Sequence, residues 1–429
     1  MTIVYLALRN LFLRRKRYAL MAIAVLLGFS LITVLSSLSF GLLETIKTKA
    51  ARYFSGHIAL ISFLGSDYCM SNPDEIIEKL KDSKIPLRTV AKRSVYYGKE
   101  SKIFFSGKSL LQRKPIGMDF EAEQKEFKNL SFVEGSYDSM LGDGGKAGIL
   151  ISKTVADILG TRVGDEIIFY MISEQGQYNT STMIVRGIFN ETGIFGYASY
   201  MRIDDLNMLY GKEENSITDI ALYAKAGADI ERLAEEIRIT LKKSFPVFQK
   251  INSRADSTRS LYVKEESIAV IPLNAQLDQI IDIINAFLFG TYFILAIFIF
   301  IVMIGILNTY RVLVHERTKE IGAMRAMGMQ KAQVRLLFLI EAAALSLISS
   351  FAGFLLGFII LNIIVKFVDL GGFSAAGLFT ENGKLNFFID AKIVFFNIIF
   401  MLSAVMLAAW GPAKKASTLP PVQALGKGI

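Results

Sequence analysis

The chain has 429 residues, of which 52% are hydrophobic and 20% are charged. A chain this apolar is not an ordinary soluble domain. It can hold this many charged residues as well only if apolar and charged residues occupy separate stretches. The formal net charge is +9, and the stretches 1–17, 311–335 and 412–429 together hold 14 basic and two acidic residues. Because these basic stretches flank apolar ones, the charge indicates membrane orientation and argues against nucleic acid as a partner.

Four stretches are long and apolar enough to cross a bilayer as helices. The first, 18–43, has 26 uncharged residues. As a helix it would reach about 39 Å, more than a hydrocarbon core of about 30 Å. A cleaved signal peptide would be shorter and would end in small residues, which this stretch does not. The other three spans are predicted over 283–310, 336–365 and 393–413. Within the span 336–365, the uncharged run is 342–365.

The basic flanks predict which segments lie in the cytoplasm, because short cytoplasmic loops are enriched in Lys and Arg. An amphipathic membrane-surface helix over 1–17, a loop over 311–335 and a tail over 414–429 are expected inside. A large domain over 44–282 and a short loop over 366–392 are expected outside. These positions describe a multi-pass protein of the bacterial inner membrane with both termini in the cytoplasm.

The large outer segment is predicted to be an α+β domain of two lobes. One β-α unit lies near its start and a similar one near its end. In both, the apolar residues recur at the spacing of a strand and then at that of a helix. The expected elements of these units are His57–Phe63, Asn72–Lys81, Ile217–Ala224 and Asp229–Lys243. We expect the two units to pack as one lobe, and a β-rich lobe over about 116–214 to be inserted between them.

Motifs for catalysis, nucleotide binding and metal binding are not found. Gly107-Lys108-Ser109 resembles the end of a phosphate-binding loop, but Lys102 stands where such a loop needs its first glycine. A single cysteine and two distant histidines do not make a metal site. Glu341, at the start of the third span, is expected at headgroup depth, and a proton-relay role is the disfavoured alternative. We predict no catalytic residue, metal or cofactor in this chain.

The most informative inner segment is VHERTKEIGAMRAMGMQKAQVR, residues 314–335. Its length predicts a short helix followed by a turn. Ile321 and Met324 form an apolar edge among charged residues, and Gly328 is placed to end the helix. A mixed-charge helix held between two spans is suited to docking on a soluble cytoplasmic protein. The alternative is a solvated loop.

Gly353 and Gly357 lie four residues apart in the third span. Glycines at this spacing permit another helix to approach closely. Packing within one chain is the favoured interpretation, and contact between two chains is the alternative.

Two inner stretches and several outer ones follow the pattern of a known family. The inner stretches are HERTKEIGAMRAMGMQKAQVRLLFLIEA, residues 315–342, and GPAKKA with LPPVQAL, residues 411–416 and 419–425. In the outer domain, Gly117-Met118-Asp119 and VRGIF at 185–189 occur in the same order as in that family. Over nearly its whole length the sequence therefore resembles the MacB/FtsX-like ABC transporter permeases.

This resemblance implies four transmembrane helices and an extracytoplasmic α+β domain, with a porter-like β-α lobe and an inserted β-rich lobe. It implies a non-catalytic subunit that pairs with a second permease chain, identical or different. A separate ATPase dimer would bind ATP and Mg²⁺, and the permease would transmit ATP-driven motion to the outer domain. The coupling contacts to the ATPase would be Arg317, Glu320, Ile321, Met324, Arg325 and Gly328.

Within the family, the chain is most similar to the lipoprotein-releasing (LolC/LolE) permeases. The similarity lies in its length, the lack of a fused ATPase and the early Gly56-His57-Ile58. This branch implies release of lipoproteins from the inner membrane to a periplasmic carrier, with membrane lipids as neighbours. The alternatives are MacB-type export of peptides or drugs, and FtsX-like signalling to a periplasmic cell-wall hydrolase.

Overall fold

The computed structural model describes residues 2–13, 15–63, 69–96, 100–112, 114–128, 130–142, 147–191, 193–253, 256, 265–371, 374–418 and 420. Most of the predicted tail over 414–429 therefore lies outside the described residues. The chain forms two compact units, which we call the helix unit and the α/β unit. The helix unit comprises Met1–Leu42, Asn285–Asp369 and Leu385–Ile429, and the α/β unit comprises Leu43–Ile284 and Leu370–Lys384.

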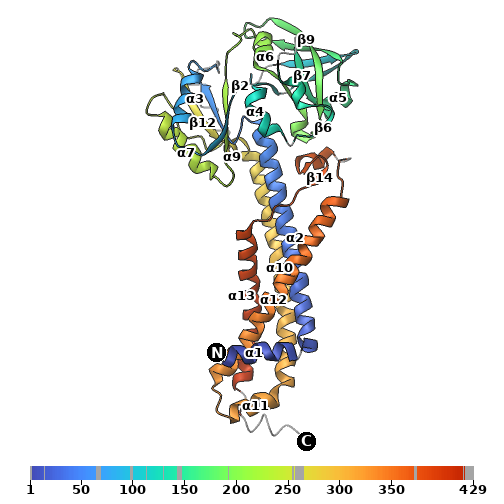
Figure 1. The fold of residues 1–429 in the computed structure, drawn as a ribbon, viewed down its shortest axis with the longest axis vertical. Helices are drawn as coiled ribbons and strands as arrows, with labels where there is room; N and C mark the ends of the chain where they lie inside the picture. Colours follow the sequence, from blue (N-terminus) through green and yellow to red (C-terminus); the bar gives the residue numbers. More distant parts are fainter. Residues whose placement is uncertain are drawn as a thin grey trace. The chain divides into compact units, whose positions relative to one another are not determined.

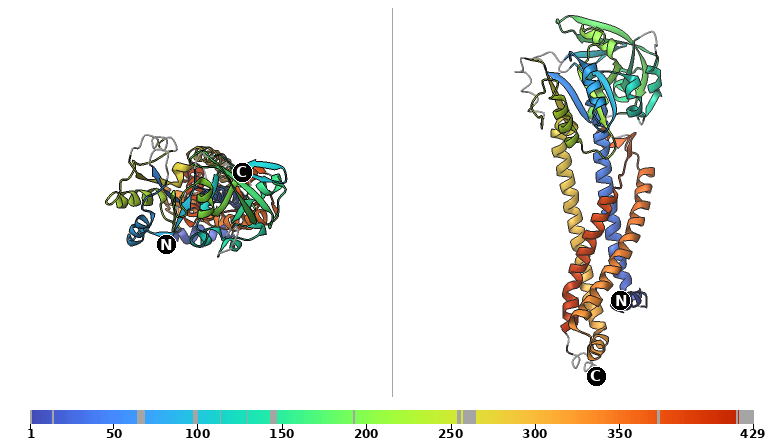
Figure 2. Two further views of the ribbon diagram at one scale, coloured as in Figure 1. Left: turned by 90° about the horizontal axis from the view of Figure 1, so that it is seen from above. Right: turned by 60° about the vertical axis from the view of Figure 1, so that its left-hand side comes forward.

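The helix unit follows the apolar runs of the sequence (Figure 1). Its long helices run side by side in the further views (Figure 2). The helices are α1 (Thr2–Leu13), α2 (Arg15–Tyr53), α10 (Asp278–Glu316), α11 (Thr318–Ala326), α12 (Lys331–Phe367) and α13 (Ala391–Thr418). Among the described residues, the four long helices α2, α10, α12 and α13 could cross a membrane by length and composition, as predicted.

Two helix boundaries differ from the predicted ones. The helix expected over 1–17 ends at Leu13, and Arg15 already belongs to α2. At its other end α2 continues to Tyr53, well past the predicted span end at Leu43. The reason is that hydropathy marks where a lipid-facing stretch stops, whereas polar helix formers such as Glu and Lys continue the helix beyond it.

Apolar side chains fill the interior of the helix unit and also cover its outside. Phe29 of α2, Ile306 of α10 and Phe338 of α12 are each 0% exposed in one cluster. In the most apolar 18-residue stretch of α10, however, only 17% of the stretch is buried, and Phe289 is 73% exposed. Exposing such area to water would cost about 25 cal/mol per Å², so these faces fit lipid.

Gly353 and Gly357 bring α12 close to α2 within the chain. A Cβ atom at Gly353 would lie 2.5 Å from Leu26 O, and one at Gly357 would lie 2.9 Å from Thr33 Cβ. Of the two interpretations of this spacing, the structure therefore shows the contact within one chain.

The α/β unit is organised around one mixed sheet. The strand order is β12-β1-β11-β2-β5-β10-β7-β9-β8-β3-β4, and β6 pairs with β9. The strands are β1 (Ile58–Phe63), β2 (Leu87–Ser94), β3 (Ser101–Phe105), β4 (Lys108–Leu111), β5 (Lys114–Met118), β6 (Phe132–Gly135), β7 (Gly148–Ser152), β8 (Glu166–Ile172), β9 (Tyr178–Phe189), β10 (Ala198–Arg202), β11 (Asp219–Ala224) and β12 (Ser267–Pro272). The helices of this unit are α3 (Pro73–Asp82), α4 (Phe120–Phe127), α5 (Lys153–Leu159), α6 (Ile203–Tyr210), α7 (Ile230–Leu241) and α9 (Leu273–Gln276).

The two predicted β-α units lie together at the β12-β1-β11-β2 end of the sheet. Their strands β1 and β11 and helices α3 and α7 match the predicted elements to within two residues. Ile77 of α3, Ile220 of β11 and Ile237 of α7 share one buried cluster. Asp229 caps α7 by accepting hydrogen bonds from the backbone N–H groups of its first turn.

The β-rich end of the sheet begins earlier in the sequence than predicted. β3 pairs with β8, and β4 pairs with β3, so both belong with strands of the segment 116–214. β5 and β10 then join the two ends into one continuous sheet. The boundary near 116 was wrong because strand pairing between distant segments is not encoded in local periodicity.

Residues 374–384, which lie between α12 and α13, are structured and belong to the α/β unit. This part of the chain holds the 3-10 helix η4 (Ser374–Leu378) and the short strands β13 (Thr380–Glu381) and β14 (Lys384–Leu385). Between the strands, Asn382 and Gly383 have φ values of 58° and 77°. Positive φ at both central residues is what a type I′ hairpin turn requires, and Asn-Gly is its preferred sequence.

Lys114 on β5 is buried inside the α/β unit. Its Nζ donates a hydrogen bond to Tyr53 O at 2.8 Å and lies 4.6 Å from the ring centroids of Tyr53 and Phe54. Burial lowers the pKa of Lys114 to about 7, although Asp219 raises it. The fold therefore favours the neutral amine more than the unfolded chain does.

We predict that Gly353→Ala destabilises the helix unit by about 1–3 kcal/mol, because the added methyl group forces α2 and α12 apart. Thermal unfolding of the purified protein in detergent measures this. Gly305→Ala is the matched control, since a Cβ at Gly305 meets nothing within 4 Å. Equal effects of the two substitutions would contradict the close α2–α12 contact.

We predict that the free energy of unfolding rises with pH in the wild type and rises less in Lys114→Met. The folded pKa of Lys114 is about 7, below an unfolded value of about 10.4. Between these values the unfolded chain binds more protons, so stability increases with pH across that window. Unfolding of both proteins at about pH 7 and about pH 9 tests this, and parallel curves would refute it.

Candidate functional site

α11 is a short helix bounded by two clear breaks in helical conformation. After α10, Arg317 has φ −94° and ψ 10°. Beyond the C-cap Met327, Gly328 has a φ of 96°, the left-handed conformation that glycine adopts without strain. Gln330 and Gln333 then form the capping box that starts α12. Gly328 thus ends the helix as predicted.

The base of α11 holds a buried ion pair. Arg317 Nη1 donates to Glu341 Oε2 at 2.8 Å and to Glu341 Oε1 at 3.1 Å. The two side chains are 1% and 0% exposed. Removing either partner would leave a buried charge unpaired, at a cost of about 3–5 kcal/mol.

Two further helices reach the same carboxylate. Tyr18 on α2 donates to Glu341 Oε2 at 2.7 Å, and Asn10 on α1 donates to Glu341 Oε1 at 2.9 Å. The Arg317 guanidinium also lies 4.9 Å from the ring centroid of Phe338 on α12. One carboxylate therefore ties α1, α2 and α12 to the junction of α10 and α11 through charge-assisted hydrogen bonds.

The predicted docking residues fall into two groups. Arg317 and Ile321 face inward, with 1% and 0% of their surface exposed. The expectation that both supply surface contacts is corrected, because Arg317 neutralises Glu341 and Ile321 packs in the apolar core. The residues with accessible surface are Glu320, Met324, Arg325 and Gly328.

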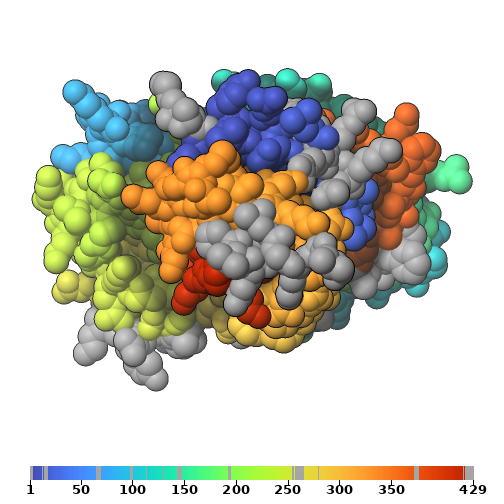
Figure 3. Space-filling view, turned by 90° about the horizontal axis from the view of Figure 1, so that it is seen from below, coloured from blue at the N-terminus to red at the C-terminus, as the bar shows by residue number. Residues whose placement is uncertain are grey.

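Figure 3 shows the surface that α11 and the start of α12 present, coloured orange, beside α1 in blue. Lys319 and Ala323 are exposed on it. Met327 is 79% exposed and was not among the predicted contacts. Its position directly before the helix-ending glycine could have identified it. Methionine is one of the residues that are enriched at protein interfaces.

Glu341 is the fully buried centre of the ion-pair network. Sequence reasoning noticed this acid but not its partners. Tyr18 and Asn10 lie hundreds of residues away in the chain, and no local pattern links them to Glu341. The available signal was a single acid at the edge of an apolar run, because an acid there needs a nearby cation.

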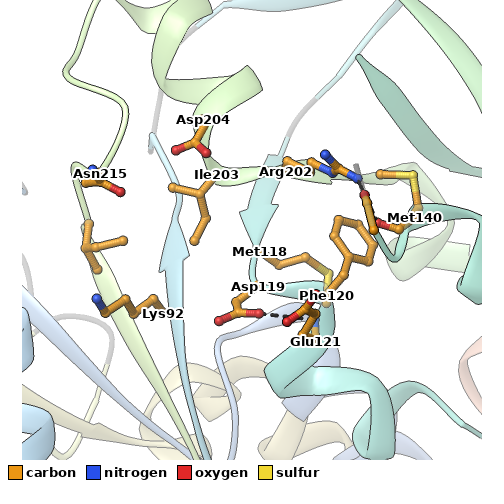
Figure 4. Close-up of a pocket in the computed structure, with 12 residues that line it drawn as sticks. Lys92, Met118, Asp119, Phe120, Glu121, Met140, Arg202, Ile203, Asp204 and Asn215 are labelled. Atoms are coloured by element: carbon orange, nitrogen blue, oxygen red, sulfur yellow. Dashed lines mark hydrogen bonds between the residues drawn. The ribbon is translucent and has the colours of Figure 1, made fainter. Parts of the chain in front are cut away.

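A separate pocket of about 440 Å³ lies in the α/β unit (Figure 4). Its charged lining residues are Lys92, Asp119, Glu121, Arg202 and Asp204. Several of these already serve the fold. Asp119 accepts from backbone N–H groups of the first turn of α4, and Lys92 pairs with Asp74 at 2.7 Å. Arg202 donates to a backbone carbonyl at 3.3 Å. The pocket therefore carries no catalytic assignment.

The phosphate-loop likeness at Gly107 is a hairpin turn. Ser106 and Gly107 have φ values of 49° and 78° and connect β3 to β4. A phosphate-binding loop precedes a helix instead. Within the described ranges, no group of three or more His, Cys, Asp or Glu side chains is placed to hold a metal ion.

Two family models match successive parts of the chain. The model described as MacB-like periplasmic core domain matches residues 18–239, more than half of the chain. The model described as FtsX-like permease C-terminal matches residues 292–421, which include α11 and its buried ion pair.

Similar proteins come from archaea and bacteria. The uncharacterized ABC transporter permease MJ0797 of Methanocaldococcus jannaschii is 25% identical over 80% of this chain and 81% of its own length. MJ1507 of the same organism is 25% identical over 52% of this chain and 49% of its own length. The macrolide export ATP-binding/permease protein MacB of Pasteurella multocida is 34% identical over 29% of this chain and 17% of its own length.

Among solved structures, the periplasmic region of MacB from Actinobacillus actinomycetemcomitans is 10% identical, with a TM-score of 0.33. The alignment covers 54% of this chain and 95% of that one. On the two family models, which follow one another along the sequence, the chain belongs to the MacB/FtsX-type family of ABC transporter permeases.

Proposed function

We propose that this chain is the non-catalytic permease subunit of an ABC transporter and that a separate ATPase docks on α11. The observation that supports this most is the construction of α11. It presents charged residues and Met327 on its surface, and its base is fixed by the Arg317–Glu341 pair. A force on such a helix is passed to the helices bonded to its base, because packed interiors transmit strain. The ATPase dimer, not this chain, would bind ATP and Mg²⁺.

In the proposed orientation, α11 and both chain termini lie in the cytoplasm of a bacterial cell, and the α/β unit lies in the periplasm. Arg311, Lys319, Arg325 and Arg335 cluster around α11. Clusters of Lys and Arg next to membrane helices favour the cytoplasmic side. The same side would give α11 access to an ATPase supplied with cytoplasmic ATP.

α10 supports a mechanical role rather than alternating access. It is one uninterrupted helix, Asp278–Glu316, which begins shortly after β12 and ends at α11. Its 39 residues would extend about 58 Å at 1.5 Å per residue. We propose that α10 carries motion from the ATPase side to the α/β unit.

For the cargo, we favour lipoproteins released from the inner membrane to a periplasmic carrier. The early Gly56-His57-Ile58 supports this branch of the family. The largely exposed apolar surface of α10, including Phe289 and Phe300, is also suited to acyl chains. In a dimer with a second permease chain, identical or different, acyl chains would enter between α2 of one chain and α10 of the other.

MacB-type export of peptides or drugs is the second candidate. It is favoured by the similarity to the Pasteurella multocida protein, which is named for macrolide export. FtsX-like signalling to a periplasmic cell-wall hydrolase is the third, since the C-terminal part matches the FtsX-like model. All three candidates use α11 in the same way and differ in what the α/β unit meets.

We predict that Glu320→Lys lowers the ATP turnover of the bound ATPase without changing yield or membrane insertion. Glu320 is 40% exposed, and its replacement leaves Arg317 paired with Glu341. Arg317→Met should instead lower the free energy of unfolding by about 3–5 kcal/mol, because Glu341 loses its counter-charge. ATPase co-purification, ATP turnover and thermal unfolding distinguish the two effects.

The matched control for this docking test is Glu75→Lys, a charge reversal at an exposed acid of α3. It should leave ATP turnover unchanged. Wild-type turnover in the Glu320→Lys complex would count against docking at α11.

We predict that depletion of this protein leaves outer-membrane lipoproteins in the inner membrane. The measurement is separation of the two membranes followed by detection of lipidated proteins, with co-purification of bound cargo from the intact complex. Normal lipoprotein sorting would reject this cargo. Increased drug sensitivity with normal sorting would favour the MacB-type alternative, and recovery of a cell-wall hydrolase would favour signalling.

A further inference from the structure

The segment 376–384, which we call the strap, is fastened to the α/β unit although the chain continues from it into α12 on one side and α13 on the other. Leu378 packs against one of the apolar clusters of the unit. Ser131 Oγ donates a hydrogen bond to Asn382 Oδ1. The strap is therefore a connection between the α/β unit and the α12–α13 pair, in addition to those made by α2 and α10.

Two basic residues of α2 hold the strap. Lys49 Nζ donates to Gly377 O at 3.0 Å, and Arg52 Nη2 donates to Glu381 Oε1 at 3.2 Å. Lys49 and Arg52 are 2% and 3% exposed, whereas the Glu381 side chain is 24% exposed. The contact thus joins a buried cation to a carboxylate at the edge of the solvent.

The main chain of Arg52 is attached to the core of the sheet. Arg93 Nη1 on β2 donates to Arg52 O at 2.8 Å. Arg93 is itself fully buried and paired with Glu123. Arg52 therefore stays with the α/β unit, and only its side chain reaches the strap.

A second carboxylate lies beside the same guanidinium. Glu191 Oε1 is 3.8 Å from Arg52 Nη2, beyond hydrogen-bond distance, and Glu191 is 4% exposed. Over the part of the chain that the structure describes, Glu191 Oε1 has no hydrogen-bond partner, and neither do Arg52 Nε and Nη1. Buried polar atoms without partners are uncommon, and here unsatisfied donors and an unsatisfied acceptor belong to neighbouring side chains.

We propose that Arg52 is a positioning residue that exchanges Glu381 for Glu191 when the strap lifts from the α/β unit. The proposal rests on the proposed function, because ATP-driven motion of α12 and α13 supplies the lift. With the strap closed, Arg52 binds Glu381. With the strap open, Arg52 hydrogen-bonds Glu191, and Glu381 turns into the solvent that it already touches.

This exchange explains how a buried cation can serve a moving contact. If Arg52 had one carboxylate only, lifting the strap would leave a guanidinium buried without a counter-charge, which is strongly unfavourable. Glu191 keeps the charge compensated in both arrangements. The strap then has two discrete states of similar energy, as elements that transmit motion need.

The proposal predicts that removing Arg52 or Glu381 speeds hydrogen exchange in the strap and that removing the charge of Glu191 slows it. Hydrogen exchange of strap amides reports lifting, and the amide of Thr380 is a suitable probe because this strap residue is only 3% exposed. In the full-length protein, Arg52→Gln should speed exchange by about tenfold or more, because the closed state loses its ion pair. Glu191→Gln should slow it, because the open state loses its counter-charge.

Two more variants complete this experiment. Glu381→Gln should speed strap exchange like Arg52→Gln, and it tests the proposal even if Arg52→Gln fails to fold. Lys102→Gln, which removes the surface ion pair with Glu100 in the same unit, should leave strap exchange unchanged. Faster exchange in Glu191→Gln, or no change in Glu191→Gln and Glu381→Gln, would overturn the proposal.

The link to transport is tested by the same measurement in membranes with the partner ATPase. ATP turnover should speed strap exchange in the wild type, and Glu191→Gln should suppress this increase. An equal increase in both would overturn the role of Glu191 and leave the proposed function intact. No increase in the wild type would count against the proposed function. Slower strap exchange in Glu191→Gln and faster strap exchange in Glu381→Gln, measured without ATP, would still support the partner exchange.

Discussion

A charge buried among apolar helices must be neutralised where it lies, and the Arg317–Glu341 pair meets this requirement at the base of α11. The arrangement of that end of the helix unit depends on it. Because Tyr18 and Asn10 bond to the same carboxylate, separating any one of the joined helices there would leave a polar group without its partner. The pair thus bonds α11 to the neighbouring helices of the helix unit.

Arg317 and Arg52 each lie between two carboxylates. Arg317 binds the buried Glu341, and its Nε donates to the exposed Glu320 at 3.3 Å. Arg52 binds Glu381, with Glu191 just out of reach. In each case a cation belonging to the interior shares its charge with a more exposed acid, so an event at the surface alters the electrostatic balance of a buried group.

The elements that could be predicted from the sequence are those with local signals. The four apolar spans and the two β-α units follow from hydropathy and periodicity, and Gly328 follows from the conformational freedom of glycine. The placement of β3 beside β8, the burial of Arg317 and the attachment of the strap depend on partners far away in the chain. For the strap, Asn382-Gly383 predicts a hairpin, but no feature of residues 376–384 indicates that Arg52 is the partner. Charged residues are expected at the surface by default, and the buried Arg317 and Arg52 are exceptions to that default.

The position of two long helices next to neighbouring strands has a consequence for the ends of those helices. α2 leads through Gly56, which has a φ of 87° and sits against the backbone of Leu222, into β1. β12 is followed by the short helix α9 and then by α10. β1 and β12 are paired antiparallel from Ile58 opposite Pro272 onward. The register of this ladder matters, because a slip by one residue would turn every side chain of the strand to the opposite face. The parts of α2 and α10 that lie next to the sheet therefore adjoin two strands whose register along each other is fixed.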